Sequence, residues 1–136
     1  MAEALFRNAL ADAGLTEKFD VSSFGTETFG GAPASRGAVR AAAARGADLS
    51  LHCSRSRADV ALDADDLIFV MTPAHLRALD DVPAQCFCIG EFFPDGAFPR
   101  EVPDPFGGSD ADYDAARDAV VSAFPRLLQF LKKLGD

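Results

Sequence analysis

One short stretch of the chain combines a carboxylate, an aromatic ring and a stiff backbone. Residues Val102–Ser109 read Val-Pro-Asp-Pro-Phe-Gly-Gly-Ser. The prolines on either side of Asp104 hold its backbone in an extended or turning conformation, and Phe106 places a ring beside the acid. A rigidly held carboxylate next to an apolar wall could act as a general acid. Considered alone, the stretch favours a structural turn in which Asp104 caps nearby amides, because most loop carboxylates are not catalytic.

Three cysteines are the other candidate reactive groups, namely Cys53, Cys86 and Cys88. Their odd number and their spacing argue against a disulfide framework or a zinc site, and we expect no metal and no cofactor. Cys53 follows His52, but neighbours on an extended segment point to opposite faces, which disfavours a Cys–His nucleophile. Cys86 and Cys88 are most simply small buried apolar residues.

The composition is that of one soluble globular domain. The chain has 136 residues, of which 49% are hydrophobic and 25% charged, enough for a single core. Its net charge of -8 argues against nucleic acid and anionic membranes as partners. No apolar run reaches transmembrane length, and Glu3 stands where a secretory signal needs a basic region. We therefore expect a single cytoplasmic domain over residues 1–136.

Helices and strands are expected to alternate along the chain and to position the Asp104 loop. The patterns predict helices at 2–14, 35–45, 55–63, after Thr72 and at 110–134, and strands at 19–25, 67–71 and 85–89. Pro125 should kink or split the last helix. This alternation predicts a three-layer α/β fold, with a parallel sheet covered by helices on both faces.

Several short motifs follow one another in a definite order. Met1–Arg7 reads Met-Ala-Glu-Ala-Leu-Phe-Arg; then come Ser-Phe-Gly-Thr at 23–26, Gly-Ala-Pro at 31–33, Gly-x-Asp-x-Ser-x-His at 46–52, Asp-Leu-Ile-Phe-Val-Met-Thr at 66–72, and Asp-Pro-Phe at 104–106 with Tyr113. Each motif alone is weak. Their order and spacing together resemble the low-molecular-weight protein tyrosine phosphatase family, including its bacterial arginine-phosphatase relatives. The resemblance covers essentially all 136 residues and reverses the interpretation of Asp104.

The resemblance implies a role for each matching residue. Asp104 resembles the general acid that protonates the leaving group and then the base that activates water. Phe106 resembles the ring that flanks the substrate side chain. Ser23 and His52 resemble residues that support the phosphate loop by hydrogen bonds, although each could equally have a structural role. The implied substrate is a phosphorylated protein, with phosphotyrosine ahead of phosphoarginine.

The chain departs from the family at the nucleophile. The family's attacking cysteine lies in a C-x5-R-[ST] loop directly before the helix that Met1–Arg7 resembles. Six positions after the three cysteines stand Asp59, Phe92 and Pro94, so the motif is absent. The reaction needs loop amides and an arginine to hold the phosphoryl oxygens while a thiolate attacks. We therefore expect no nucleophile within residues 1–136 and no activity from this chain alone.

The resemblance also implies an N-terminal truncation relative to the family. In the family's four-stranded sheet, the missing first strand is central, between the segments matching 19–25 and 66–72. We expect the coding sequence upstream of Met1 to encode this strand and the loop; a misassigned start, a shortened chain and a true loss remain open. Without the strand, exposed edges should pair with another chain, as a dimer or aggregate, or rearrange to close the gap.

Two other functions remain open. One is a non-catalytic binding protein derived from the fold. The other is an arsenate-reductase-like enzyme, which would need resolving cysteines in a mobile loop rather than in the strand expected at 85–89.

Overall fold

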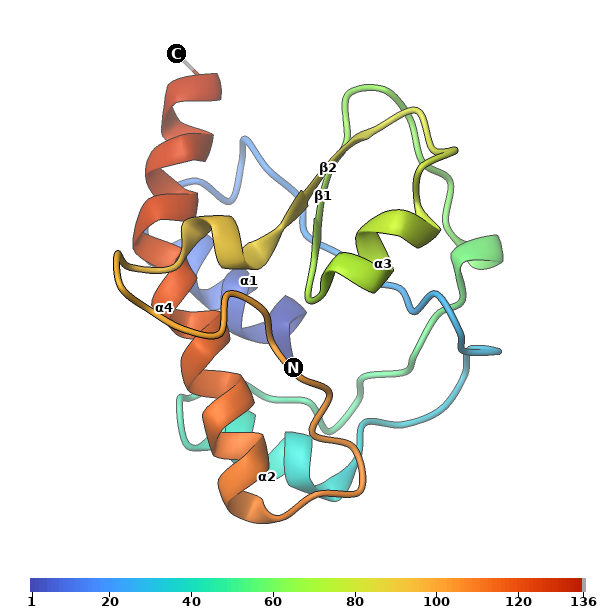
Figure 1. Cartoon of the computed structure of the whole chain (residues 1–136), viewed down its shortest axis with the longest axis vertical. Helices are drawn as coiled ribbons and strands as arrows, with labels where there is room; N and C mark the ends of the chain where they lie inside the picture. The colour runs from blue at the N-terminus through green and yellow to red at the C-terminus, as the bar shows by residue number, and fades with distance from the viewer. Residues whose placement is uncertain (136) are drawn as a thin grey trace.

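The computed structural model describes residues 1–135. The elements in chain order are α1 (Ala2–Asp12), α2 (Arg36–Ala43), the 3-10 turn η1 (Arg57–Asp59), β1 (Leu67–Val70), α3 (Pro73–Ala78), β2 (Gln85–Cys88), the 3-10 turn η2 (Ile89–Phe92) and α4 (Asp110–Leu134). Figure 1 shows α1 and α4 on one side of the two strands and α3 on the other. The expected α/β fold, with a parallel sheet and helices on both faces, is confirmed.

Side chains of β1 alternate between the two helical layers. β1 and β2 pair in parallel, from Leu67 opposite Gln85 to Val70 opposite Cys88. Ile68 and Val70 are buried in a cluster that includes Leu79 and Leu76 from the α3 region. On the other face, neighbouring aromatic rings lie with centroids 5.4 to 6.2 Å apart and join the sheet to α4; they belong to Phe69, Phe87, Phe92 and Phe130. This period of two is what a strand covered on both faces requires.

Polar side chains mark the starts of three helices. Ser35 accepts a hydrogen bond from the Ala38 amide at the start of α2, and Thr72 accepts one from the His75 amide at the start of α3. At α4, Ser109 and Asp112 form a reciprocal capping box. Each cap satisfies amides that a helix start leaves without an internal partner.

The main core lies between α1 and α4. Leu5, Val120 and Phe124 are buried there, and the ring of Phe6 meets that of Phe124 edge to face, with centroids 5.0 Å apart. Burial of the apolar stripe of α4 fixes the helix against α1.

Within residues 1–135, no helix has both the length and the apolar composition needed to cross a membrane.

The strand predicted at 19–25 is wrong. Only Gly25 forms a bridge, with Ser56, and no backbone hydrogen bond from the amides of Asp20–Phe24 occurs within residues 1–135. The segment has no adjacent strand on the side that faces β1, so its extended backbone has no ladder to join. The sheet of the described residues therefore has two strands, β1 and β2.

Two helix predictions also need correction. The helix expected at 55–63 is only the turn η1, because the Ser56–Asp59 capping box closes one turn and Val60 then returns to an extended conformation, with φ -121° and ψ 124°. Pro125 does not split α4, which is continuous from Asp110 to Leu134. Buried residues on both sides of Pro125, including Val120 and Leu131, stabilise the continuous helix, so packing outweighs the lost hydrogen bond.

Candidate active site

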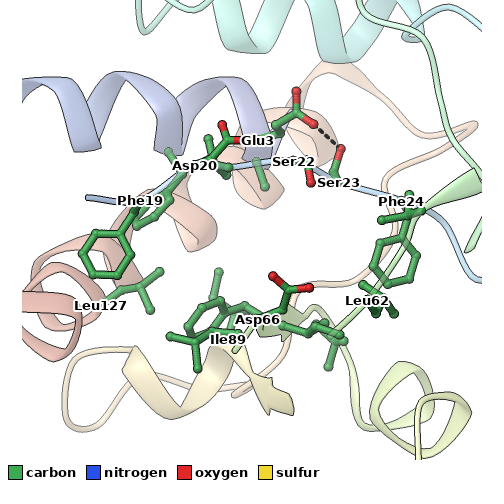
Figure 2. Close-up of a pocket in the computed structure, with 18 of the residues that line it drawn as sticks. Glu3, Phe19, Asp20, Ser22, Ser23, Phe24, Leu62, Asp66, Ile89 and Leu127 are labelled. Carbon is green, nitrogen blue, oxygen red and sulfur yellow. Dashed lines mark hydrogen bonds between the residues drawn. The ribbon is translucent and has the colours of Figure 1, made fainter. Parts of the chain in front are cut away.

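Glu3, in the first turn of α1, is the centre of a polar group at the N-terminal end of this helix. Its side chain is only 9% exposed. Oε1 accepts a hydrogen bond from Ser23 Oγ at 2.8 Å, and Oε2 accepts one from Arg7 Nη2 at 3.2 Å. Figure 2 shows the hydrogen bond between Ser23 and Glu3, both of which line a cavity. The first turn of a helix is also where its dipole favours an anion.

His52 and Arg55 approach the same carboxylate from a different segment. His52 Nδ1 lies 3.9 Å from Oε2 of Glu3, and Arg55 Nη2 lies 3.6 Å from Oε1. Burial alone would raise the pKa of Glu3, but the hydrogen bonds from Ser23 and Arg7 and the charge of Arg7 outweigh it, and the pKa is lowered from its ordinary value. Glu3 is therefore ionised, and its contacts join three segments of the chain.

The structure brings Ser23 and His52 together through a residue that the sequence predictions missed. Ser23 and His52 are far apart in sequence, and both converge on Glu3. The one available signal was the i, i+4 spacing of Glu3 and Arg7, which places an acid and a base on one helix face. This spacing is common on exposed helices, so by itself it does not indicate a site.

The loop that carries Asp104 is anchored at the C-terminal end of β1. The Val102 amide donates to the Met71 carbonyl at 2.9 Å, and the Val102 side chain is buried in the cluster that Met1 and Ala2 also contact. In Figure 1 this loop, drawn in orange between η2 and α4, passes beside the N-terminus. Asp104 therefore lies two residues after Val102, whose contacts hold the loop near the start of α1.

Asp104 itself has the geometry of a turn. Its Oδ1 accepts a hydrogen bond from the Phe106 amide at 3.0 Å, and the Gly108 amide donates to the Pro105 carbonyl at 2.8 Å. Asp104 is exposed and the Phe106 ring is 80% exposed. Within residues 1–135, neither residue forms a hydrogen bond with the Ser23–Glu3–His52 group. The loop therefore presents a fixed carboxylate and a ring to solvent.

The cysteines lie in different surroundings. Cys53 is exposed, and Cys86 and Cys88 are part of β2. Burial raises the pKa of the Cys86 thiol, which disfavours the reactive thiolate. Strand placement was expected for Cys86 and Cys88, and it is confirmed.

Comparisons with known proteins agree with this architecture. The family model for low molecular weight phosphotyrosine protein phosphatase matches residues 1–135. A protein tyrosine phosphatase from Entamoeba histolytica with Hepes in its active site is 23% identical, with a TM-score of 0.83 over 99% of this chain and 89% of that one. A low molecular weight protein tyrosine phosphatase from T. tengcongensis is 26% identical, with a TM-score of 0.76 over 94% and 87% of the two chains.

A third solved structure is that of YwlE arginine phosphatase with a phosphorylated active-site serine. It is 28% identical, with a TM-score of 0.79 over 97% of this chain and 86% of that one. A search of curated protein sequences gave no match. The family match over nearly every residue, together with the shared fold, shows that this chain belongs to the low molecular weight phosphotyrosine protein phosphatase family.

Proposed function

We propose that this chain carries the acid and the supporting residues of a protein phosphatase that acts through a phosphocysteine. The observation that supports this most is the convergence of Ser23 and His52 on Glu3 in the first turn of α1. A phosphate loop joined to the start of this helix would lie against these side chains. Such supporting groups orient a loop and do not react themselves.

The proposed reaction has two steps. A cysteine thiolate attacks phosphorus, the bond to the leaving atom of the substrate breaks, and Asp104 gives its proton to that atom. Water then attacks the phosphocysteine, Asp104 takes the proton of the water, and phosphate leaves with the thiolate restored. No C-x5-R motif occurs in residues 1–136, so this chemistry requires such a loop joined ahead of α1, and residues 1–136 alone should be inactive.

The proposed substrate is a phosphorylated protein side chain, and we place phosphotyrosine first because the family is named for it. Phosphoarginine is the second candidate. The exposed ring of Phe106 is followed by two glycines, which leaves an open wall, and YwlE arginine phosphatase is 28% identical. The ratio of kcat/KM on phosphotyrosine and phosphoarginine peptides decides between them, measured on the chain extended by a strand and a C-x5-R-[ST] loop.

Asp104→Asn in this extended chain tests the proposed mechanism. Loss of a general acid should lower kcat by about 10²- to 10⁴-fold on aryl phosphates with poor leaving groups, and much less where the leaving group needs no proton. Asp80→Asn, at an exposed carboxylate in the turn after α3, is the matched control and should leave both rates unchanged. Equal rates for Asp104→Asn and the unsubstituted chain on a poor leaving group would remove Asp104 from the mechanism.

The rival functions make different predictions for the same extended chain. A binding protein that descends from the fold would bind phosphopeptides without turnover. An arsenate-reductase-like enzyme would need Cys86 and Cys88 to act as resolving cysteines in a mobile loop. Their position in the strand β2 disfavours this role. We expect the phosphatase to act in the cytoplasm.

A further inference from the structure

Tyr113 lies at the end of the first turn of α4, shortly after the Asp104 loop, and the proposed chemistry gives it no role. The residue is only 7% exposed, and its Oη is hydrogen-bonded to Ser35 Oγ at 3.1 Å. Its ring covers Gly37 in α2, where any larger side chain would overlap the ring. Figure 1 shows α2 beside the first turns of α4. Shape and a hydrogen bond therefore both hold Tyr113 against the start of α2.

Backbone hydrogen bonds connect Tyr113 to the acid loop. The Tyr113 amide donates to the Ser109 carbonyl at 3.2 Å, and the Gly108 amide donates to the Pro105 carbonyl at 2.8 Å. Pro105 directly follows Asp104, and its ring restricts the backbone there. A shift of the first turn of α4 would therefore also move Asp104.

Ser35, the partner of Tyr113, comes from a part of the chain that is tied to the start of α1. The residues just before it pair with the His52 segment, where the Ser54 amide donates to the Ala32 carbonyl at 2.7 Å. His52 in turn lies 3.9 Å from Glu3. The hydrogen bond between Ser35 and Tyr113 therefore joins the acid loop to the segment that contacts the first turn of α1.

An arginine reinforces the same junction from the solvent side. Arg40 Nη2 donates to the Asp110 carbonyl at 3.0 Å and to Asp114 Oδ1 at 2.9 Å. These groups are largely exposed, and ion pairs in water contribute little to the geometry. The Tyr113 hydroxyl belongs to a buried residue, so its hydrogen bond is the contact that fixes one position.

We propose that Tyr113 is a positioning residue for Asp104, and that its hydrogen bond to Ser35 sets the place of the acid relative to the start of α1. The inference rests on the proposed function, in which Asp104 protonates the leaving atom of a phosphoryl group held there. Such a proton transfer needs donor and acceptor within about 2.6–3.2 Å, and a small misplacement of a catalytic group is costly. A loop that could shift at α4 would present the acid correctly for only part of the time.

Tyr113→Phe tests this inference, because it keeps the ring against Gly37 and removes the hydroxyl alone. In the chain extended by a strand and a C-x5-R-[ST] loop, kcat/KM on phenyl phosphate should fall by about two- to tenfold, the range for loss of one hydrogen bond. On 4-nitrophenyl phosphate, whose leaving group needs no proton, kcat/KM should be unchanged. A general loss of folded enzyme would lower both values alike, so the ratio isolates the position of the acid.

Two further variants show whether the effect passes through Ser35. Ser35→Ala also removes the cap of α2, but in its background Tyr113→Phe should have no further effect on the ratio of the two kcat/KM values. Ser122→Ala is the matched control, because it removes a hydroxyl that donates within α4 to the Ala119 carbonyl at 2.6 Å. It should leave the ratio unchanged.

Hydrogen exchange on the 136-residue chain tests the same contact without any activity. Fragments covering 103–109 should exchange about two- to tenfold faster in Tyr113→Phe, and fragments covering 73–79 should not change. The inference is overturned if exchange in 103–109 is unaltered, or if Tyr113→Phe lowers both kcat/KM values equally or neither while Asp104→Asn lowers that on phenyl phosphate. If Asp104→Asn keeps its full rate on phenyl phosphate, the proposed function fails and the inference fails with it.

Discussion

At the scale of single residues, Glu3 links the segments that the candidate site needs. One partly buried carboxylate accepts hydrogen bonds from Ser23 and Arg7 and lies near His52 and Arg55. The hydrogen bonds and the charge of Arg7 overcome the effect of burial and lower the pKa of Glu3. The ionised form is therefore the one that stabilises the fold.

This gives a pH dependence with a definite sign. Because the pKa of Glu3 is lower in the folded chain than in the unfolded one, its contribution is fully present above the ordinary carboxyl pKa and is lost as the pH falls through the lowered value. Glu3→Gln should reduce the free energy of unfolding at pH 7 by about 1.5–3 kcal/mol, the usual range for hydrogen bonds to a charged group. Urea unfolding at pH 7 and at successively lower pH should show this difference shrinking below about pH 4.

The matched control for Glu3 is Glu17→Gln, at an exposed position, which should change stability little at any pH. A Glu3→Gln effect that persists undiminished at low pH would contradict the role given to the ionised carboxylate.

At the scale of elements, the acid loop depends on a close approach between η2 and the segment before Val102. A side chain at Gly90 would overlap the backbone carbonyl group of Arg100. Only glycine therefore allows this contact, and it helps to hold the segment whose Val102 amide bonds to Met71.

Gly90→Ala should consequently destabilise the chain, by about 1–3 kcal/mol or more, because one backbone segment must move away from the other. In the extended enzyme it should also reduce kcat, since the anchor of the Asp104 loop shifts. Thermal unfolding measures the first effect. Gly135→Ala is the control, because a Cβ there meets nothing closer than 3.6 Å; equal stabilities for the two variants would show that the Gly90 contact does not constrain the loop.

Sequence patterns predicted those elements whose interactions are mostly local or whose residues are plainly apolar. α2, α3 and α4 begin at caps that can be read from Ser35, Thr72 and Ser109, and β1 is an apolar run. The strand prediction at 19–25 failed because a strand depends on a neighbouring strand. The sequence pattern of the segment carries no information about whether that neighbour is present. Glu3 was missed for a related reason, since its partners Ser23 and His52 come from distant parts of the chain.

At the scale of the whole molecule, the described sheet ends at β1, and a cavity lies between β1 and the segment Asp20–Phe24. A domain of this size has a total stability of only about 5–15 kcal/mol, and each orphaned buried amide or carbonyl costs about 1–3 kcal/mol. The chain alone should therefore be marginal, and its exposed edges should make it prone to association.

Light scattering combined with hydrogen exchange measures this instability. We expect the 136-residue chain alone to associate or to exchange rapidly at the amides of Leu67–Met71. A strand joined ahead of α1 should suppress both effects. A monodisperse monomer in which all the Leu67–Met71 amides are strongly protected would contradict the placement of the strand.

Turnover of a simple aryl phosphate tests the central claim most directly. Three proteins are compared: the 136-residue chain, the chain extended by a strand and a C-x5-R-[ST] loop, and the extended chain with serine in place of the loop cysteine. We expect activity in the second alone, because only there does a thiolate face a phosphate-binding loop. Turnover by the 136-residue chain that is abolished by Cys53→Ser would contradict it, since the reacting thiolate would then lie within residues 1–136.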